Sequence, residues 1–177
     1  RRALELARAA GNIAMLNPAP PLADEAGTLL PLADLITPNE TEFTHLLARC
    51  AGLDVDATAL ATLSETELHV LARRLPVQTV VITLGGAGVF VSHGEHARWR
   101  DTATHYRLAA EAVQVRDTTG AGDAFSGSLA AALAQRNDAP FADAIARANR
   151  VAGLATEFHG AACAMPTREA VIARFGD

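Results

Sequence analysis

Residues 117–134 read DTTGAGDAFSGSLAAALA, a turn of small residues that leads into an Ala- and Leu-rich segment. Ala and Leu favour helix, so we expect a helix over 122–135. The first N–H groups of a helix have no partner inside it, and small residues let a ligand approach them closely. Together with the positive end of the helix dipole, these groups form a site for an anion.

Asp123 lies in the first turn of this expected helix. Its negative charge would repel a bound phosphate, which is unexpected if the turn only binds anions. The charge makes sense if Asp123 accepts a proton from a hydroxyl group that attacks the phosphate, as a general base does. An Asp that merely stabilises a helix N-terminus, after an ordinary glycine turn, explains the spacing equally well.

Short apolar runs alternate with helical segments in the rest of the chain. Residues 79–84 (TVVITL) are β-branched or apolar throughout, which is typical of a strand covered on both faces. Residues 64–67 (SETE) form a capping-box pattern that predicts the start of a helix. The alternation indicates an α/β sheet with helices on its faces. We expect helices over 2–10, 22–31, 40–48, 64–75, 122–135, 141–156 and 168–174, strands over 13–16, 34–37, 79–84, 89–91, 96–100 and 112–115, and a polar linker over 52–63.

The composition excludes several classes of protein. The 177 residues are 50% hydrophobic, enough for one globular domain, and no apolar run approaches the ~20 residues that span a bilayer. The net charge of −5, without a basic cluster, argues against a nucleic-acid partner. All 15 cationic residues are Arg, so a Walker A lysine, a Schiff-base lysine and a lysine general base are excluded.

The two cysteines, Cys50 and Cys163, are far apart and have no metal-binding spacing. Two cysteines cannot form a disulfide framework, and their apolar or small neighbours favour buried free thiols in a reducing compartment. Residues 1–5 begin inside a helical pattern and lack the apolar core of a signal peptide. We therefore expect a cytoplasmic protein with no membrane partner.

Four segments, in the same order, resemble the ribokinase-like (PfkB) family of carbohydrate kinases, and its ribokinase branch in particular. The turn and helix over 117–134 match the family's C-terminal signature over a long and specific stretch. The resemblance covers essentially the whole chain, and it implies a three-layer α/β fold with helices on both faces of the sheet. The other matching segments are NPAP over 17–20 with DLITPNETE over 34–42, TLGGAGV over 83–89, and GAA over 160–162 with MPTR over 165–168.

The resemblance implies transfer of the ATP γ-phosphoryl group to a primary hydroxyl of a small sugar, most closely D-ribose, to give ribose 5-phosphate. Asp123 would be the general base. The backbone N–H groups of Gly120, Ala121 and Gly122 would hold the charge that develops on the transferred group. These amides matter more than usual here, because the chain has no lysine to help.

Asn39 and Glu42 match the family's N-x-x-E motif, which by resemblance organises Mg²⁺ and phosphate, largely through water. Mg²⁺ prefers oxygen ligands and keeps several waters, so this chemistry is reasonable. The same residues also fit a capping box, in which Asn39 caps a helix and Glu42 returns the bond. The two roles are compatible.

A further set of residues matches the family's nucleotide site. For the loop after residue 82, a plain strand–turn–strand is the simpler explanation if the loop is taken alone. One helical residue falls where the family places a side chain near the adenine, and would otherwise be a solvated polar residue. These positions are Thr83, Gly85, Gly86 and Gly88 in the loop, and Asn149 on the helix.

Ribokinases also bind a monovalent cation, potassium, beside the anion hole. Asp117 would supply the charged ligand here, although an Asp at this point also commonly initiates a turn. Ala164 stands where ribokinases often carry Ser, which removes one side-chain ligand. The positions that match the cation site, mostly through backbone carbonyls, are Asp117, Thr119, Ala155, Phe158 and Gly160.

The resemblance begins inside the family pattern. We expect residues 1–177 to form the C-terminal nucleotide-binding and catalytic part of one kinase domain, with the N-terminal half and its β-lid missing. Because that half carries most sugar contacts and the lid excludes water, the chain alone should turn over little substrate. It would also expose a sheet edge that could pair with a second copy. The alternatives are another PfkB sugar or nucleoside kinase, and a non-catalytic nucleotide-binding fragment that needs a partner chain.

Overall fold

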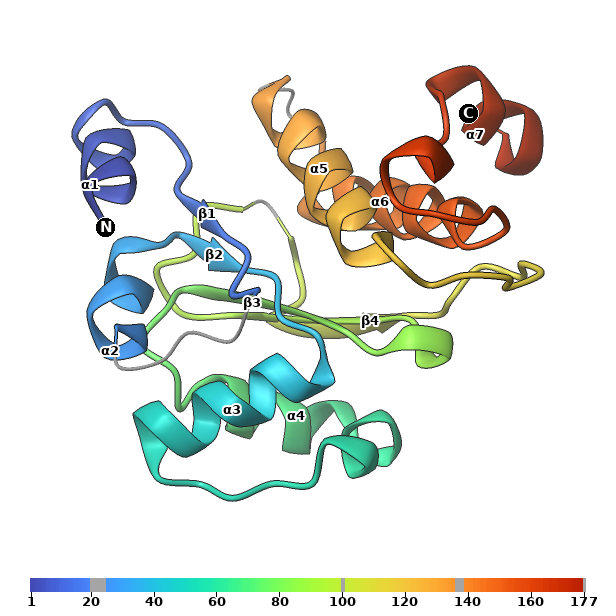
Figure 1. Cartoon of the computed structure of the whole chain (residues 1–177). Helices are drawn as coiled ribbons and strands as arrows, with labels where there is room; N and C mark the ends of the chain where they lie inside the picture. The colour runs from blue at the N-terminus through green and yellow to red at the C-terminus, as the bar shows by residue number, and fades with distance from the viewer. Residues whose placement is uncertain (20–24, 100, 136–138, 177) are drawn as a thin grey trace. The chain divides into compact units, whose positions relative to one another are not determined.

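The structure is a computed structural model that describes residues 1–19, 25–99, 101–135 and 139–176 (Figure 1). The chain divides into two compact units, Arg1–Arg107 and Leu108–Asp177. None of the helices in the described ranges combines the length and the apolar composition needed to cross a membrane.

A five-stranded mixed sheet forms the centre of the first unit, with the strands in the order β1-β2-β3-β4-β5. The first three strands pair in parallel, with Leu35 opposite Met15 on one side and Thr79 on the other. β4 runs antiparallel to β3. The expected α/β class is confirmed. The strands are β1 (Met15–Leu16), β2 (Leu35–Ile36), β3 (Thr79–Thr83), β4 (Val89–His93) and β5 (His105–Leu108).

Helices of the first unit connect the parallel strands. In Figure 1, α3 and α4 lie together on one side of the sheet. They bury Phe43, Leu47 and Leu68 in one apolar cluster with Ile82 and Phe90 of the sheet. This burial is the main source of stability of the unit. The helical elements are α1 (Arg2–Ala9), α2 (Ala26–Leu29), η1 (Leu30–Leu32), α3 (Glu40–Ala51), η2 (Ala57–Thr62), α4 (Glu65–Ala72) and η3 (Gly85–Ala87).

The central strands are buried on both faces. Successive side chains of a strand point to opposite faces, so the neighbours of Ile82 and Phe90 point away from the α3–α4 cluster. Val81 and Val91 are nevertheless fully buried, as is Leu35. The apolar run over 79–84 correctly predicted this kind of strand.

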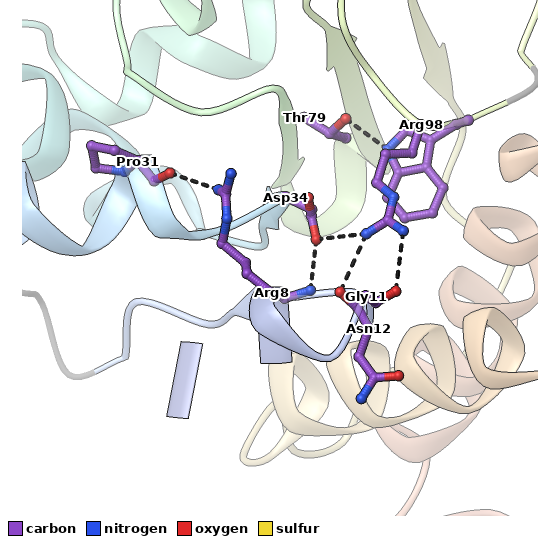
Figure 2. A network of polar contacts seen from close by, with 9 residues as sticks. Arg8, Gly11, Asn12, Pro31, Asp34, Thr79 and Arg98 are labelled. Carbon is purple, nitrogen blue, oxygen red and sulfur yellow. Dashed lines mark hydrogen bonds and ion pairs between the residues drawn. The ribbon is translucent and has the colours of Figure 1, made fainter. Parts of the chain in front are cut away.

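A polar network ties the end of α1 to the sheet (Figure 2). Arg98 Nη1 donates to the Asp34 carboxylate at 3.1 Å and to the Asn12 carbonyl at 3.2 Å, and its Nη2 donates to the Gly11 carbonyl at 3.4 Å. Asp34 also accepts the backbone N–H of Ala14 at 2.8 Å. One arginine thereby fixes the turn at Gly11 and Asn12 that follows the first helix.

The segment before β5 differs from the prediction. Residues 96–99 are not a strand, and residue 100 lies outside the described residues. Trp99 instead turns inward and donates its Nε1–H to Thr79 Oγ1 at 2.7 Å. Thr79 also lies 3.1 Å from His93 Nδ1. The expected strand over 96–100 is therefore wrong for 96–99, because the indole needs a buried partner rather than a neighbouring strand.

The second unit consists of helices, of which α5 and α6 pack against each other. Leu129 of α5 and Ile145 and Ala148 of α6 are fully buried. All three helices predicted beyond residue 120 are confirmed to within a residue or two. They are α5 (Ala121–Ala134), α6 (Phe141–Ala155) and α7 (Arg168–Phe175), with a short η4 (Ala162–Ala164).

Residues 112–115 do not form the strand that their apolar character predicted. Their neighbours bond to the end of α6 instead: the N–H groups of Arg116 and Asp117 donate to the Thr156 carbonyl at 2.8 and 3.1 Å. The N–H of Gln114 donates to the Glu157 carboxylate at 2.9 Å. These donors are satisfied without a sheet, so no strand is needed.

Three smaller expectations also need correction. The expected linker over 52–63 contains η2, which starts where Asp56 Oδ1 accepts the N–H of Thr58 at 2.9 Å. The expected helix over 22–31 is the short α2 followed by η1, and its residues 22–24, like Pro20 of the NPAP segment, lie outside the described residues. Cys50 is half-buried, but Cys163 is exposed, so the expectation of two buried thiols is wrong.

Candidate functional site

The glycine-rich turn forms the N-terminus of α5. Gly120 is the N-cap residue and has a φ of +78°, in the left-handed region that glycine adopts without strain. A Cβ at this position would lie 3.0 Å from the Ala161 Cβ. Both facts explain why this position is glycine. The Asp123 side chain follows in the first turn and is exposed.

The backbone amides of this turn are largely uncommitted. The N–H of Ala121 donates to the Thr118 carbonyl at 3.2 Å, and the N–H of Ala124 makes the first helical bond, to Gly120, at 2.9 Å. The N–H groups of Gly120, Gly122 and Asp123 have no acceptor among the described residues. Three donors next to an exposed carboxylate therefore remain available to a ligand at the start of α5.

Asp117 is held by two loops at once. Its Oδ1 accepts the Thr119 N–H at 2.9 Å, and its Oδ2 accepts the Gly160 N–H at 2.8 Å. Hydrogen bonds from the Thr119 side chain, and then from the N–H groups of Gly160 and Thr119, lower the pKa of Asp117 to about 2. The residue is therefore ionised at neutral pH, and it joins the loop before α5 to the loop after α6.

The other residues matched to a cation site lie in the same loops, except Ala155, which is the last residue of α6. Phe158 has an exposed side chain, and its N–H donates to the carbonyl of the buried Ala155 at 3.3 Å. Ala164 is buried and offers no side-chain ligand. No cluster of three or more His, Cys, Asp or Glu side chains suited to a metal exists within the described ranges. A cation here would thus rely on Asp117 and on backbone carbonyls.

Asn39 and Glu42 form the capping box that their spacing predicted. Asn39 Oδ1 accepts the Glu42 N–H at 2.9 Å, and Glu42 Oε2 accepts the Asn39 N–H at 2.9 Å. Asn39 is exposed, whereas Glu42 is only 8% exposed. The cap fixes both side chains at the start of α3, where the helix end favours negative charge.

The loop after β3 lies beside this cap. Thr83 pairs with Asn39 in a parallel bridge, and its N–H donates to the Pro38 carbonyl at 3.0 Å. Gly85 and Gly88 have φ values of +51° and +89°, so both need the freedom of glycine. Gly85 and Gly86 are exposed, whereas Gly88 is buried. The first unit therefore brings Asn39, Glu42, Thr83 and the glycines of this loop together, although the motifs are about forty residues apart in sequence.

Asn149 has a structural partner. Its Nδ2 donates to the Ala109 carbonyl at 2.7 Å, which ties α6 to the segment that follows β5. The side chain is half-buried, so it is neither a freely solvated residue nor one whose whole amide group is free for a base.

Sequence reasoning missed two sets of residues. The Thr156 carbonyl positions Asp117, but a backbone acceptor leaves no residue-type signal. Asp123 also lines a cavity of about 410 Å³ between α5, α6 and α7, which is bordered by Arg147 and Arg150. The i, i+3 spacing of these arginines, which puts them on one helix face, was the available signal.

Comparison with known proteins identifies the family. Residues 1–168 match the model of the pfkB family of carbohydrate kinases. The chain is 36% identical over 169 residues to a ribokinase of Haemophilus influenzae, covering 94% of this chain and 48% of that protein. It is 34% identical over 169 residues to a ribokinase of Staphylococcus aureus, covering 96% and 50%. The chain thus spans about half the length of these curated relatives.

Solved structures agree on the fold. The crystal structure of a ribokinase from Thermotoga maritima has a TM-score of 0.75 at 25% identity, covering 99% of this chain and 52% of that one. Ribokinase from Arabidopsis thaliana, solved with ribose and ATP, has a TM-score of 0.76 at 22% identity, covering 97% and 50%. The chain belongs to the pfkB family of carbohydrate kinases.

Proposed function

We propose that this chain supplies the nucleotide-binding and catalytic part of an ATP-dependent sugar kinase whose acceptor is D-ribose. The observation that carries the proposal is the exposed carboxylate of Asp123 beside unengaged N–H groups at the start of α5. Transfer of a phosphoryl group to an alcohol requires a base and a set of N–H groups that donate hydrogen bonds to the phosphate oxygens. Both are present at the start of α5. Ribose is supported by the curated relatives, which are ribokinases.

Asp123 accepts the proton of the sugar hydroxyl as its oxygen attacks the γ-phosphorus of ATP. The bond from that phosphorus to the β,γ-bridging oxygen breaks, and ADP leaves with the electron pair. The N–H groups of Gly120, Gly122 and Asp123 then stabilise the charge on the transferred group. Ala121, which was expected to belong to this set, is replaced by Asp123 because the Ala121 N–H donates to the Thr118 carbonyl at 3.2 Å. Since the chain has no lysine, this charge must be met by backbone dipoles, by arginine or by metal ions.

Mg²⁺ and a monovalent cation belong to this proposal. Asn39 and Glu42 present oxygen atoms at the start of α3, which suits Mg²⁺ held largely through water. When bound, Mg²⁺ supplies neutralising charge to the nucleotide phosphates. The positions matched to potassium lie in the loop before α5 and at the end of α6 with the loop that follows it, and Asp117 is their charged group. They are Asp117, Thr119, Ala155, Phe158 and Gly160.

We also propose a second, non-catalytic function, because the chain spans about half the length of its ribokinase relatives. In this alternative the chain binds nucleotide but needs a partner chain for catalysis. A kinase for another sugar or a nucleoside is the remaining option. A cytoplasmic location and self-association through a sheet edge stay predictions.

Calorimetric titration with ATP and Mg²⁺ tests the shared part of these functions. Binding is expected under both, and a chain that binds no ATP contradicts both. A coupled assay of ADP release then compares D-ribose with D-fructose and adenosine as acceptors. Turnover that is highest with ribose supports the ribokinase assignment, whereas ATP binding without turnover of any acceptor favours the non-catalytic role.

A further inference from the structure

Glu40, the first residue of α3, lies beside the loop that follows β3. A Cβ placed on Gly85 of this loop would be 3.8 Å from Glu40 Oε1. The parallel bridge between Asn39 and Thr83 brings the two segments together. Because Gly85 and Gly86 are exposed, a ligand that binds to the loop meets the Glu40 carboxylate.

The Glu40 carboxylate has no partner in the described part of the chain. It makes no hydrogen bond or ion pair with any described residue, although the side chain is half-buried. Glu42 differs, because its Oε2 accepts the Asn39 N–H at 2.9 Å and the residue is only 8% exposed. A partly shielded carboxylate without a protein partner is available to a cation from outside the chain.

The start of α4 shows what Glu40 contributes to its own helix. α3 begins with NETE over 39–42 and α4 with SETE over 64–67, and both segments form a capping box. Glu40 and Glu65 are therefore each the first residue of a capped helix, where a negative charge is favourable. Glu65 is exposed and is not a close neighbour of any described glycine. The contact with the glycine loop is what distinguishes Glu40 from Glu65.

The charge of Glu40 opposes the binding of a metal-free nucleotide. The loop after β3 is proposed to meet the phosphates of ATP, and two negative groups this close repel each other. Residues 34–42 and 83–89 contain no arginine, lysine or histidine that could offset the repulsion from within these segments. A divalent cation between the carboxylate and the phosphates reverses the effect. Mg²⁺ is commonly held in this way, by one or two carboxylates together with substrate phosphates.

We propose that Glu40 makes the nucleotide site selective for ATP in complex with Mg²⁺ over metal-free ATP. Its carboxylate binds the metal ion, largely through water, and repels the phosphates of the free nucleotide. Asn39 is neutral and Glu42 is engaged in the cap, so Glu40 is the charged group that remains available. The inference deepens the proposed function and rests on it, since it requires that the nucleotide binds at this loop.

Calorimetric titration of the chain with ATP at fixed ionic strength, in excess Mg²⁺ or in excess EDTA, tests the inference. The wild-type chain should bind ATP at least about tenfold more tightly with Mg²⁺ than without it. Glu40→Gln should weaken binding with Mg²⁺ by roughly threefold and tighten binding without Mg²⁺ by roughly threefold. A merely structural role would weaken both, so the opposite shifts are diagnostic. A variant that keeps the wild-type preference, or a wild-type chain without a preference, overturns the proposal.

Glu65→Gln is the matched control. It removes the same charge from the same position of a capped helix, and both dissociation constants should stay within about twofold of the wild-type values. Glu40→Gln and Glu65→Gln should lose a similar small part of the free energy of unfolding, which urea unfolding measures. If both variants change the preference for the metal complex equally, the effect belongs to the net charge of the chain and the role of Glu40 is refuted.

The outcomes separate this inference from the proposed function. ATP binding with the same preference in wild type and in Glu40→Gln removes only the role of Glu40 and leaves the kinase function standing. A chain that binds ATP neither with nor without Mg²⁺ removes both, because no nucleotide then meets the loop.

Discussion

The backbone N–H of Gly160 donates to the carboxylate of Asp117 at 2.8 Å, across 43 residues of sequence. The other oxygen of this carboxylate accepts the N–H of Thr119 at 2.9 Å. This pair of hydrogen bonds, the Asp117 clamp, joins the loop before α5 to the loop after α6. The glycine-rich turn at Gly120 follows Asp117 directly in the sequence. A residue matched to a cation site is therefore also a structural link.

This clamp predicts acid sensitivity. Hydrogen bonds from Thr119 and Gly160 hold the pKa of Asp117 at about 2, below its ordinary value of 3.8. A depressed carboxylate pKa means that its contribution to stability is complete above 3.8 and is lost as the pH falls towards 2. Asp117→Asn should lower Tm at neutral pH, and the difference from wild type should shrink on acidification. Melting curves across this range test it, and a constant difference contradicts it.

Gly120→Ala should destabilise the chain. The φ of +78° and the 3.0 Å approach to Ala161 both oppose a side chain here. We expect a loss of ~1–3 kcal/mol in the free energy of unfolding. Gly127→Ala is the matched control, because nothing lies within 4 Å of its Cβ inside α5. That change should stabilise by ~0.5–1 kcal/mol. Urea unfolding measures both, and equal effects would show that the turn is not restrained.

Capping and ligand binding can be separated at Asn39. Asn39→Ala should cost ~1 kcal/mol of stability, and so should Ser64→Ala, which removes the equivalent cap of α4. Only Asn39→Ala should also weaken the binding of ATP with Mg²⁺. Asn39→Asp keeps an acceptor for the Glu42 N–H and should restore the stability. If both alanine variants bind ATP like wild type, Asn39 is only a cap.

A pair of stacked histidines predicts a second pH dependence. The rings of His69 and His105 lie 4.4 Å apart, and His69 Nδ1 is 2.8 Å from Ser92 Oγ. Burial, and then the charges of His105, Arg73 and His93, lower the pKa of His69 below its ordinary 6.5. The unfolded chain therefore binds this proton more readily, so stability present above about 6.5 is lost as the pH falls.

His69→Gln should flatten this dependence, because glutamine does not titrate and can still bond to Ser92. His96→Gln is a control at an exposed histidine that follows β4. Chemical denaturation at about pH 8 and at about pH 5 measures the effect. The expectation is contradicted if His69→Gln loses as much stability between these pH values as wild type does.

Local signals predicted much of the fold. The capping boxes at Asn39 and Ser64 formed as expected, because each is satisfied within four residues. The strand over 79–83 and the helix over 121–134 also follow from their own composition. β5 was missed because His105 and Arg107 break the apolar pattern, although the strand is held by pairing at the sheet.

In the candidate site, too, local features could be predicted and contacts between distant segments could not. The turn at Gly120 and the exposure of Asp123 could be predicted, since both belong to one short segment. The Asp117–Gly160 bond and the arginine-lined cavity could not, because each depends on segments far apart in the chain. The strand predicted over residues 112–115 was wrong for the same reason. The backbone N–H groups in and just after this segment donate to the end of α6 rather than to a neighbouring strand.

The role of Asp123 as the base is the central claim, and ribose-dependent release of ADP from ATP measures it most directly. Asp123→Asn keeps the shape of the side chain but cannot accept the proton. Any turnover of the wild-type chain should fall by ~10²–10⁴-fold in this variant. Its dissociation constant for ATP should stay within about threefold of wild type, or become tighter, because a like charge is removed. Turnover that survives Asp123→Asn at the wild-type rate would contradict the claim.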